Sequence, residues 1–88
     1  MLLAIDIGNS RINLALFREE NLVKADFFPK DDWKKFPFKK FIGKKKVNEI
    51  FLASVVPSLT KKVALFCRQN LRPEPRCRWK TLRKPKLP

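Results

Sequence analysis

MLLAIDIGNSRINLALF, residues 1–17, indicates both the fold of this chain and a candidate site. Two apolar runs, residues 2–5 and 12–17, flank the polar segment at residues 6–11. Short runs rich in Leu and Ile and bounded by turn residues are typical of β-strands. We therefore predict two strands joined as a hairpin.

The polar turn of this hairpin has the residue types that a phosphate site needs. Gly8 lets the backbone approach a bound group closely, and Asn9 and Ser10 add short hydrogen-bonding side chains. Asp6 follows a buried strand, where its carboxylate can hold a metal ion directly or through water. Backbone N–H groups beside a carboxylate suit a magnesium-bound phosphate. The alternative is a hairpin turn in which Asp, Gly and Asn serve only the turn itself.

Two segments of the chain together resemble the type III pantothenate kinases. The first is the D-x-G-N-S turn at residues 6–10, and the second is FLASVVPSLT, residues 51–60, with its S-V-V-P signature. Their order and separation also match that family, and the resemblance covers residues 1–71. It implies the fold of the acetate kinase, sugar kinase, Hsc70 and actin superfamily, in which two ribonuclease H-like halves enclose ATP.

The resemblance also implies which residues bind ATP and substrate. Asp6 is the expected contact to magnesium, directly or through water. The expected phosphate-binding residues are Asp6, Ile7, Gly8, Asn9, Ser10, Arg11, Ile12 and Asn13. The expected floor of the substrate cleft is Ser54, Val55, Val56 and Pro57. From the residues alone, Arg11 can equally be a surface charge, and Val55 and Val56 can be packing residues of a buried strand.

The family reaction transfers the γ-phosphoryl group of ATP to pantothenate, the first step toward coenzyme A. A monovalent cation, potassium or ammonium, assists, and the family enzymes are homodimers. The family's general base is an aspartate in a G-x-D-R motif, and a second D-x-G-T motif follows it. In this chain the last aspartate is Asp32, and Glu74 is the only acidic residue after Glu49. No catalytic residue can be assigned, and we expect a truncated family member that is inactive alone.

Charge suggests a different class of function. The formal net charge is +13, from 21 Lys and Arg against 8 Asp and Glu. Residues 30–46 contain eight lysines against Asp31 and Asp32, whereas the first 29 residues are slightly acidic. A charge of this size attracts nucleic acid, so the alternative function is a small basic nucleic-acid-binding module. It is equally compatible with a lysine-rich solvated surface on a protein whose substrates are phosphates.

Composition places the chain among globular proteins. No apolar run approaches the ~20 residues needed to cross a bilayer. The amino-terminal run lacks a basic region before it and is broken by Asp6, unlike a signal peptide. We expect a cytoplasmic protein without a membrane partner. Cys67 and Cys77 have no metal-binding spacing, so we expect reduced thiols, with Cys67 on a helix face.

Along the chain the pattern predicts an α/β half-domain with the order β-β-β-α-β-α. Residues 22–28 form the third strand, and Pro37 interrupts a helical stretch over residues 31–42. Residues 50–56 form a buried strand, and Pro57 opens a second helix. The aromatic residues of the first helical stretch should face the core. Residues 1–71 are therefore the ribonuclease H-like half-domain. Residues 72–88 are expected to be a basic, proline-rich tail, disordered or outside the family sequence.

Overall fold

The computed structural model of the protein describes residues 1–71 and 77–83. After three consecutive strands, its elements alternate between helical segments and strands, which gives a mixed α/β fold. In chain order they are β1 (Leu2–Ile7), β2 (Arg11–Arg18), β3 (Asn21–Pro29), the 3-10 helix η1 (Lys30–Lys35), α1 (Phe38–Ile42), β4 (Glu49–Ser54), α2 (Pro57–Asn70) and β5 (Arg78–Arg83). Over residues 2–70 this agrees with the predicted order β-β-β-α-β-α.

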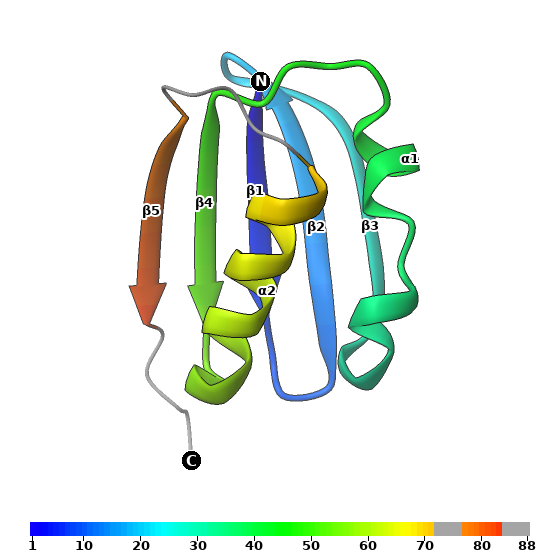
Figure 1. The fold of residues 1–88 in the computed structure, drawn as a ribbon. Coiled ribbons are helices and arrows are strands. Elements are labelled where there is room, and N and C mark those ends of the chain that lie inside the picture. Colours follow the sequence, from blue (N-terminus) through cyan, green and yellow to red (C-terminus); the bar gives the residue numbers. More distant parts are fainter. Residues whose placement is uncertain (72–76, 84–88) are drawn as a thin grey trace.

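The five strands form one sheet in the order β3-β2-β1-β4-β5. The hairpins β1–β2 and β2–β3 are antiparallel, whereas β4 pairs in parallel with both β1 and β5 (Figure 1). In the β1–β4 pair, Ile7 lies opposite Ser54. The carboxyl ends of β1, β4 and β5 therefore meet at one edge of the sheet, which also contains the β1–β2 turn.

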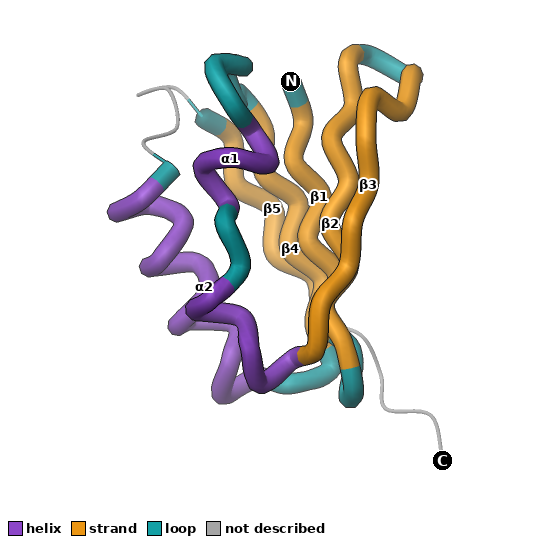
Figure 2. Tube along the Cα trace, turned by 90° about the vertical axis from the view of Figure 1, so that its right-hand side faces the viewer, coloured by secondary structure: helices purple, strands orange, loops and turns teal. Residues whose placement is uncertain are grey.

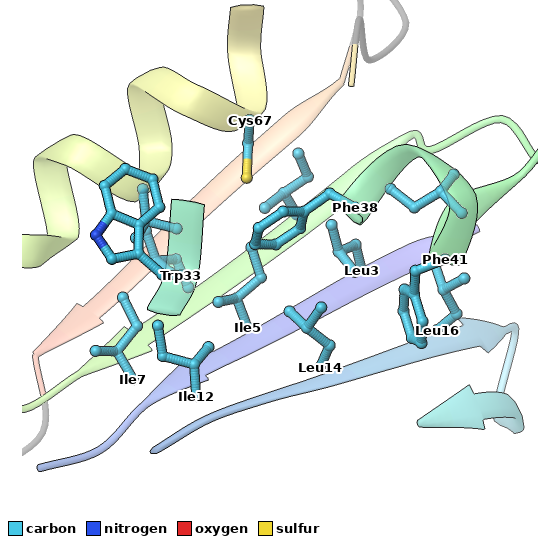
Figure 3. Packing of buried hydrophobic residues seen from close by; sticks show 14 of the residues in the cluster. Leu3, Ile5, Ile7, Ile12, Leu14, Leu16, Trp33, Phe38, Phe41 and Cys67 are labelled. Atoms are coloured by element: carbon cyan, nitrogen blue, oxygen red, sulfur yellow. The ribbon is translucent and has the colours of Figure 1, made fainter. Parts of the chain in front are cut away.

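The helices cover one face of this sheet, and the hydrophobic core lies between the two layers (Figure 2). Strand residues alternate between buried and half-buried positions in β1 and β2, so the buried set faces the helices. Figure 3 shows these side chains meeting Trp33, Phe38 and Cys67 from the helical layer. The strand residues of this core include Leu3, Ile5, Ile7, Ile12, Leu14, Leu16, Ile50 and Leu52.

Aromatic contacts attach η1 and α1 to the rest of the core. Trp33 and Phe38 each contact Phe66 of α2, with ring centroids 5.4 and 5.3 Å apart. Phe36 stacks on Phe28 of β3 at 4.3 Å. The helical stretch is interrupted at Pro37, as predicted, because proline lacks the N–H that a continuous helix needs there. The prediction that its aromatic residues face the core is confirmed.

Two predictions about the elements need correction. Residues 78–83 form strand β5, so the tail expected to be disordered contributes a strand; residues 72–76 and 84–88 lie outside the described residues. A parallel strand at the edge of a sheet is held by its backbone and tolerates charged side chains, which hides it from an apolar pattern. Strand β4 also ends at Ser54, so Val55 and Val56 belong to the junction before α2.

No described helix covers the second face of the sheet (Figure 2), which we call the open face. The register places Ala4, Ala15 and Ala25 side by side across β1, β2 and β3 on this face. Phe51 of β4 pairs with Ala4, and Phe27 of β3 is 60% exposed. The middle of the open face is therefore made of small and apolar side chains.

Candidate functional site

The β1–β2 turn is held in place from two sides by backbone hydrogen bonds. The Gly8 N–H donates to the Arg11 carbonyl at 2.9 Å, which closes the turn. The Lys30 N–H donates to the Ser10 carbonyl at 3.0 Å, which ties the turn to the start of η1. Asn9 and Ser10 are exposed at the tip. The turn thus presents its polar residues from a fixed backbone.

Asp6 and Asn13 lie on the open face just behind this turn. They are directly opposite each other in the β1–β2 register, and both are half-buried. Together with Ala15 and Phe27 they line a shallow cavity of about 370 Å³. The Arg11 guanidinium lies over the Phe27 ring, 4.9 Å from its centroid, at the same end of the sheet. Asp26 also lines this cavity. The geometry places two acidic residues, an amide and a cation around one apolar floor.

The second predicted segment lies beside the same turn. Ser54 pairs with Ile7 in the β1–β4 register, and the Val55 N–H donates to the Ile7 carbonyl at 3.0 Å. Two segments more than forty residues apart in the sequence therefore meet at one sheet edge. The structure brings together the two stretches whose residues predict a site.

Within that segment, Ser54 shapes the strand-to-helix junction. Its hydroxyl donates to the Val56 carbonyl at 3.1 Å and accepts the Val56 N–H at 2.9 Å, and its side chain is 2% exposed. Pro57 is the first residue of α2, where a missing N–H costs nothing. Val56 packs against the core, which agrees with the prediction that it is a packing residue.

Asp6 and Asn13 lie on the opposite face of the sheet from Ser54 and Pro57. Ile7 and Ile12, which were also expected to bind phosphate, are fully buried in the core on the helical side. Ser54 and Pro57 line a groove of about 450 Å³ between α2 and β5, on the helical side. Asp6 and Asn13 line the cavity on the open face. The two segments share an edge of the sheet, but their side chains do not share a cavity.

The residues around Asp6 fit a magnesium ion that also binds phosphate. Mg²⁺ prefers oxygen ligands and usually takes one or two carboxylates, completing its shell with water and substrate phosphates. Asp6 supplies one carboxylate beside the exposed turn. Residues 1–71 and 77–83 contain no cluster of three or more His, Cys, Asp or Glu side chains that could hold a metal alone. The donor set therefore suits a metal brought by a nucleotide.

Sequence reasoning missed the floor of the Asp6 cavity. Phe27, whose ring lies under the Arg11 guanidinium, was predicted as a residue of the third strand and was not assigned to the site. Ala15 and Ala25 line the cavity beside it. The signal that could have found them was strand alternation: Ala15 lies two residues after Asn13, and Ala25 two residues before Phe27, so the members of each pair share a face of the sheet.

Comparison with known protein families gives a match over nearly the whole chain. A family model described as Type III pantothenate kinase matches residues 2–85 of the chain. The match includes strand β5 and extends beyond residue 71, the expected end of the resemblance. No curated protein matches the chain. Among the described residues, no helix is both long and apolar enough to span a membrane.

Proposed function

The chain belongs to the type III pantothenate kinase family, and on this premise we propose that its β1–β2 turn binds the phosphates of Mg-ATP for phosphorylation of pantothenate. The observation that carries the proposal is the meeting of the two motifs. The D-x-G-N-S turn and the S-V-V-P junction lie at one sheet edge, joined by the Val55 N–H to Ile7 carbonyl bond. Ligands of open α/β sheets bind outside the carboxyl ends of the strands, which is this edge.

In this proposal each part of the turn has a separate role. Gly8 allows close approach of the phosphates, and Asn9 and Ser10 donate hydrogen bonds from the exposed tip. Magnesium, when bound with the nucleotide, neutralises charge on the phosphate oxygens, and Asp6 is the residue that would hold it. Arg11 adds a cation whose position is set by the Phe27 ring. Ser54 and Pro57 keep the neighbouring junction in shape.

We assign no residue of this chain to activation of the hydroxyl group that accepts the phosphoryl group. Phosphoryl transfer needs a group that orients or deprotonates the accepting hydroxyl, and no such base is evident in this sequence. We propose that the chain alone binds nucleotide but does not phosphorylate pantothenate. The ribonuclease H-like assignment, the monovalent cation, the homodimer and a cytoplasmic location belong to the same proposal.

The test is Mg-ATP binding by calorimetry to the unaltered chain and to Asp6→Ala. Glu20→Ala is the matched control, since it removes one exposed carboxylate at the β2–β3 turn, the opposite end of the sheet. We expect Asp6→Ala to weaken Mg-ATP binding about tenfold, equivalent to about 1.4 kcal/mol, and Glu20→Ala to leave it unchanged.

The sign of the effect makes the test decisive. Removing a negative charge from a protein site should strengthen binding of an anion unless that charge acts through a metal. If Asp6→Ala binds ATP equally well or better with magnesium present, the proposed role of Asp6 is wrong. With a chelator present, Asp6→Ala should bind ATP at least as tightly as the unaltered chain, because Asp6 then only repels the phosphates.

A further inference from the structure

The helical layer, defined as η1, α1 and α2, has a large excess of basic over acidic residues. Helices η1 and α1 contain five lysines and only two acidic residues, Asp31 and Asp32. Helix α2 contains two lysines and one arginine and has no acidic residue. Lys34, Lys35, Lys39 and Lys40 are exposed, and Lys30 is half-buried.

Packing of the aromatic residues dictates where these lysines lie. Trp33, Phe38 and Phe41 are at most 8% exposed because they face the sheet. Their neighbours in the sequence are Lys34, Lys39 and Lys40, which the helical geometry turns away from the core. The Lys34 ammonium lies over the Trp33 ring, 5.6 Å from its centroid. Burial of one set of side chains therefore forces the other set onto one outer surface.

Contacts between the helices join their charges into one surface. Phe66 of α2 contacts both Trp33 and Phe38, so α2 packs directly against η1 and α1. Lys61 and Lys62 on α2 are exposed. Figure 2 shows all three helices on the same side of the sheet. Asp6 lies on the open face of the sheet, so this basic surface is separate from the proposed nucleotide site.

We propose that the outer surface of the helical layer binds the phosphate backbone of nucleic acid without reading its sequence. Lysine ammonium groups are mobile point charges that pair with phosphate oxygens and carry no base preference. Binding of this kind releases counterions from the nucleic acid, so the affinity falls steeply as salt rises. Each phosphate neutralised contributes about 0.9 to the slope of log K against log salt on duplex DNA.

The experiment uses a fluorescein-labelled duplex DNA of arbitrary sequence and fluorescence anisotropy at a series of sodium chloride concentrations. The surface variant is Lys34→Gln, Lys35→Gln, Lys39→Gln and Lys40→Gln together. The control variant changes four other basic residues to glutamine and so has the same net charge; they are Arg72, Arg76, Lys84 and Lys86. Circular dichroism establishes that both variants are folded.

We expect the surface variant to bind at least about tenfold more weakly and to lower the salt slope by about two or more, at about 0.9 for each phosphate that is no longer neutralised. The control variant should change both quantities much less. Equal weakening in the two variants would show that net charge alone attracts DNA and would overturn the proposal. So would absence of DNA binding at low salt, or binding to vesicles with anionic lipid but not to DNA.

A second measurement needs no variant. Brief acetylation of the unaltered chain, followed by mass spectrometry, reports which lysines DNA protects. Protection of Lys34, Lys35, Lys39 and Lys40 is the expected result. Uniform protection along the chain, or protection confined to Lys80, Lys84 and Lys86, contradicts it. The proposed DNA-binding surface is separate from the proposed nucleotide site. We therefore expect the surface variant to bind Mg-ATP as the unaltered chain does.

Discussion

Position 8 shows why one residue type is needed where the phosphates are proposed to bind. A Cβ at Gly8 would lie 3.2 Å from the Arg11 carbonyl oxygen, which is tighter than about nine in ten Cβ contacts in proteins. That same carbonyl accepts the Gly8 N–H. A side chain here would shift the bond that closes the turn and, with it, Asn9 and Ser10. Gly8 thus serves the shape of the turn as well as access to it.

Cys67 gives a prediction about pH. Burial raises the pKa of the Cys67 thiol from 9.0 to about 12, because the thiolate would be desolvated in the core. The unfolded chain loses this proton near pH 9 while the folded chain keeps it. The unfolded state then binds fewer protons, so stability is fully present below pH 9 and is lost as pH rises toward 12. The slope is at most about 1.4 kcal/mol per pH unit.

Urea unfolding of three proteins at several pH values from about 8 upward checks this prediction. Both cysteines are reduced thiols, and Cys77 is only partly buried, so Cys77→Ala is the matched control. Cys67→Ala should be less stable at neutral pH because it leaves a gap in the core. It should nevertheless lose less stability on going to alkaline pH than the unaltered chain or Cys77→Ala. Parallel pH profiles for all three would rule out the Cys67 thiol as the cause.

At the scale of elements, attachment of α1 depends on Phe38. This side chain is 2% exposed and contacts the rings of Phe28, Phe36 and Phe66. We expect Phe38→Ala to lower the free energy of unfolding by about 3–5 kcal/mol, because apolar surface is no longer buried and a cavity remains. In a domain of this size such a decrease approaches the whole stability. Urea unfolding measures it.

Phe27→Ala is the comparison for Phe38→Ala. Phe27 is 60% exposed, and its ring contacts the Arg11 guanidinium at 4.9 Å. Its removal should cost about 1 kcal/mol or less, in the range of an exposed cation–π pair. If the two variants were equally unstable, the core would not lie on the helical face as described.

The elements whose side chains form the core could be predicted from the sequence. Strand β5, which is held in the sheet by backbone pairing with β4, could not. Strands β1 and β2 alternate between buried and half-buried residues, and Pro37 marks the break between η1 and α1. Both features are local and visible in the letters. Strand β5, RWKTLR, contains three basic residues, and its place beside β4 depends on pairing with a distant strand. Local patterns contain no information about that partner.

The candidate site was predictable in part for the same reason. A turn motif is local, so Asp6, Gly8, Asn9 and Ser10 could be chosen from the residues, and the family resemblance added Ile7 and residues 11–13. That Ser54 faces the helical side while Asp6 faces the open side follows from register, since Asp6 pairs with Ala53 and Ile7 with Ser54. A shift of one residue in register would exchange the two faces. Only the structure specifies it.

The whole molecule separates three kinds of surface. The helical layer is basic on the outside, and the middle of the open face is small and apolar. Asp6, Asn13 and the polar turn lie together at the end of the sheet where β1 ends. This arrangement arises because the described helices all cover the same face of the sheet and contain many of the chain's exposed lysines. It predicts that charge repulsion within the folded chain is larger than its composition alone would suggest.

Salt should therefore stabilise the folded chain. With a formal net charge of +13 on 88 residues, folding brings lysines closer together than they are in the unfolded chain. Chloride at ~0.1 M reduces the range of this repulsion to about 10 Å. We expect Tm to rise as sodium chloride is added, by about 4–8 °C for each kcal/mol of repulsion removed. The combined Lys34, Lys35, Lys39 and Lys40 to glutamine variant should show a smaller rise, because its close charges are already gone. A Tm that falls with salt, or rises equally in both proteins, would mean that repulsion across the helical layer does not limit stability.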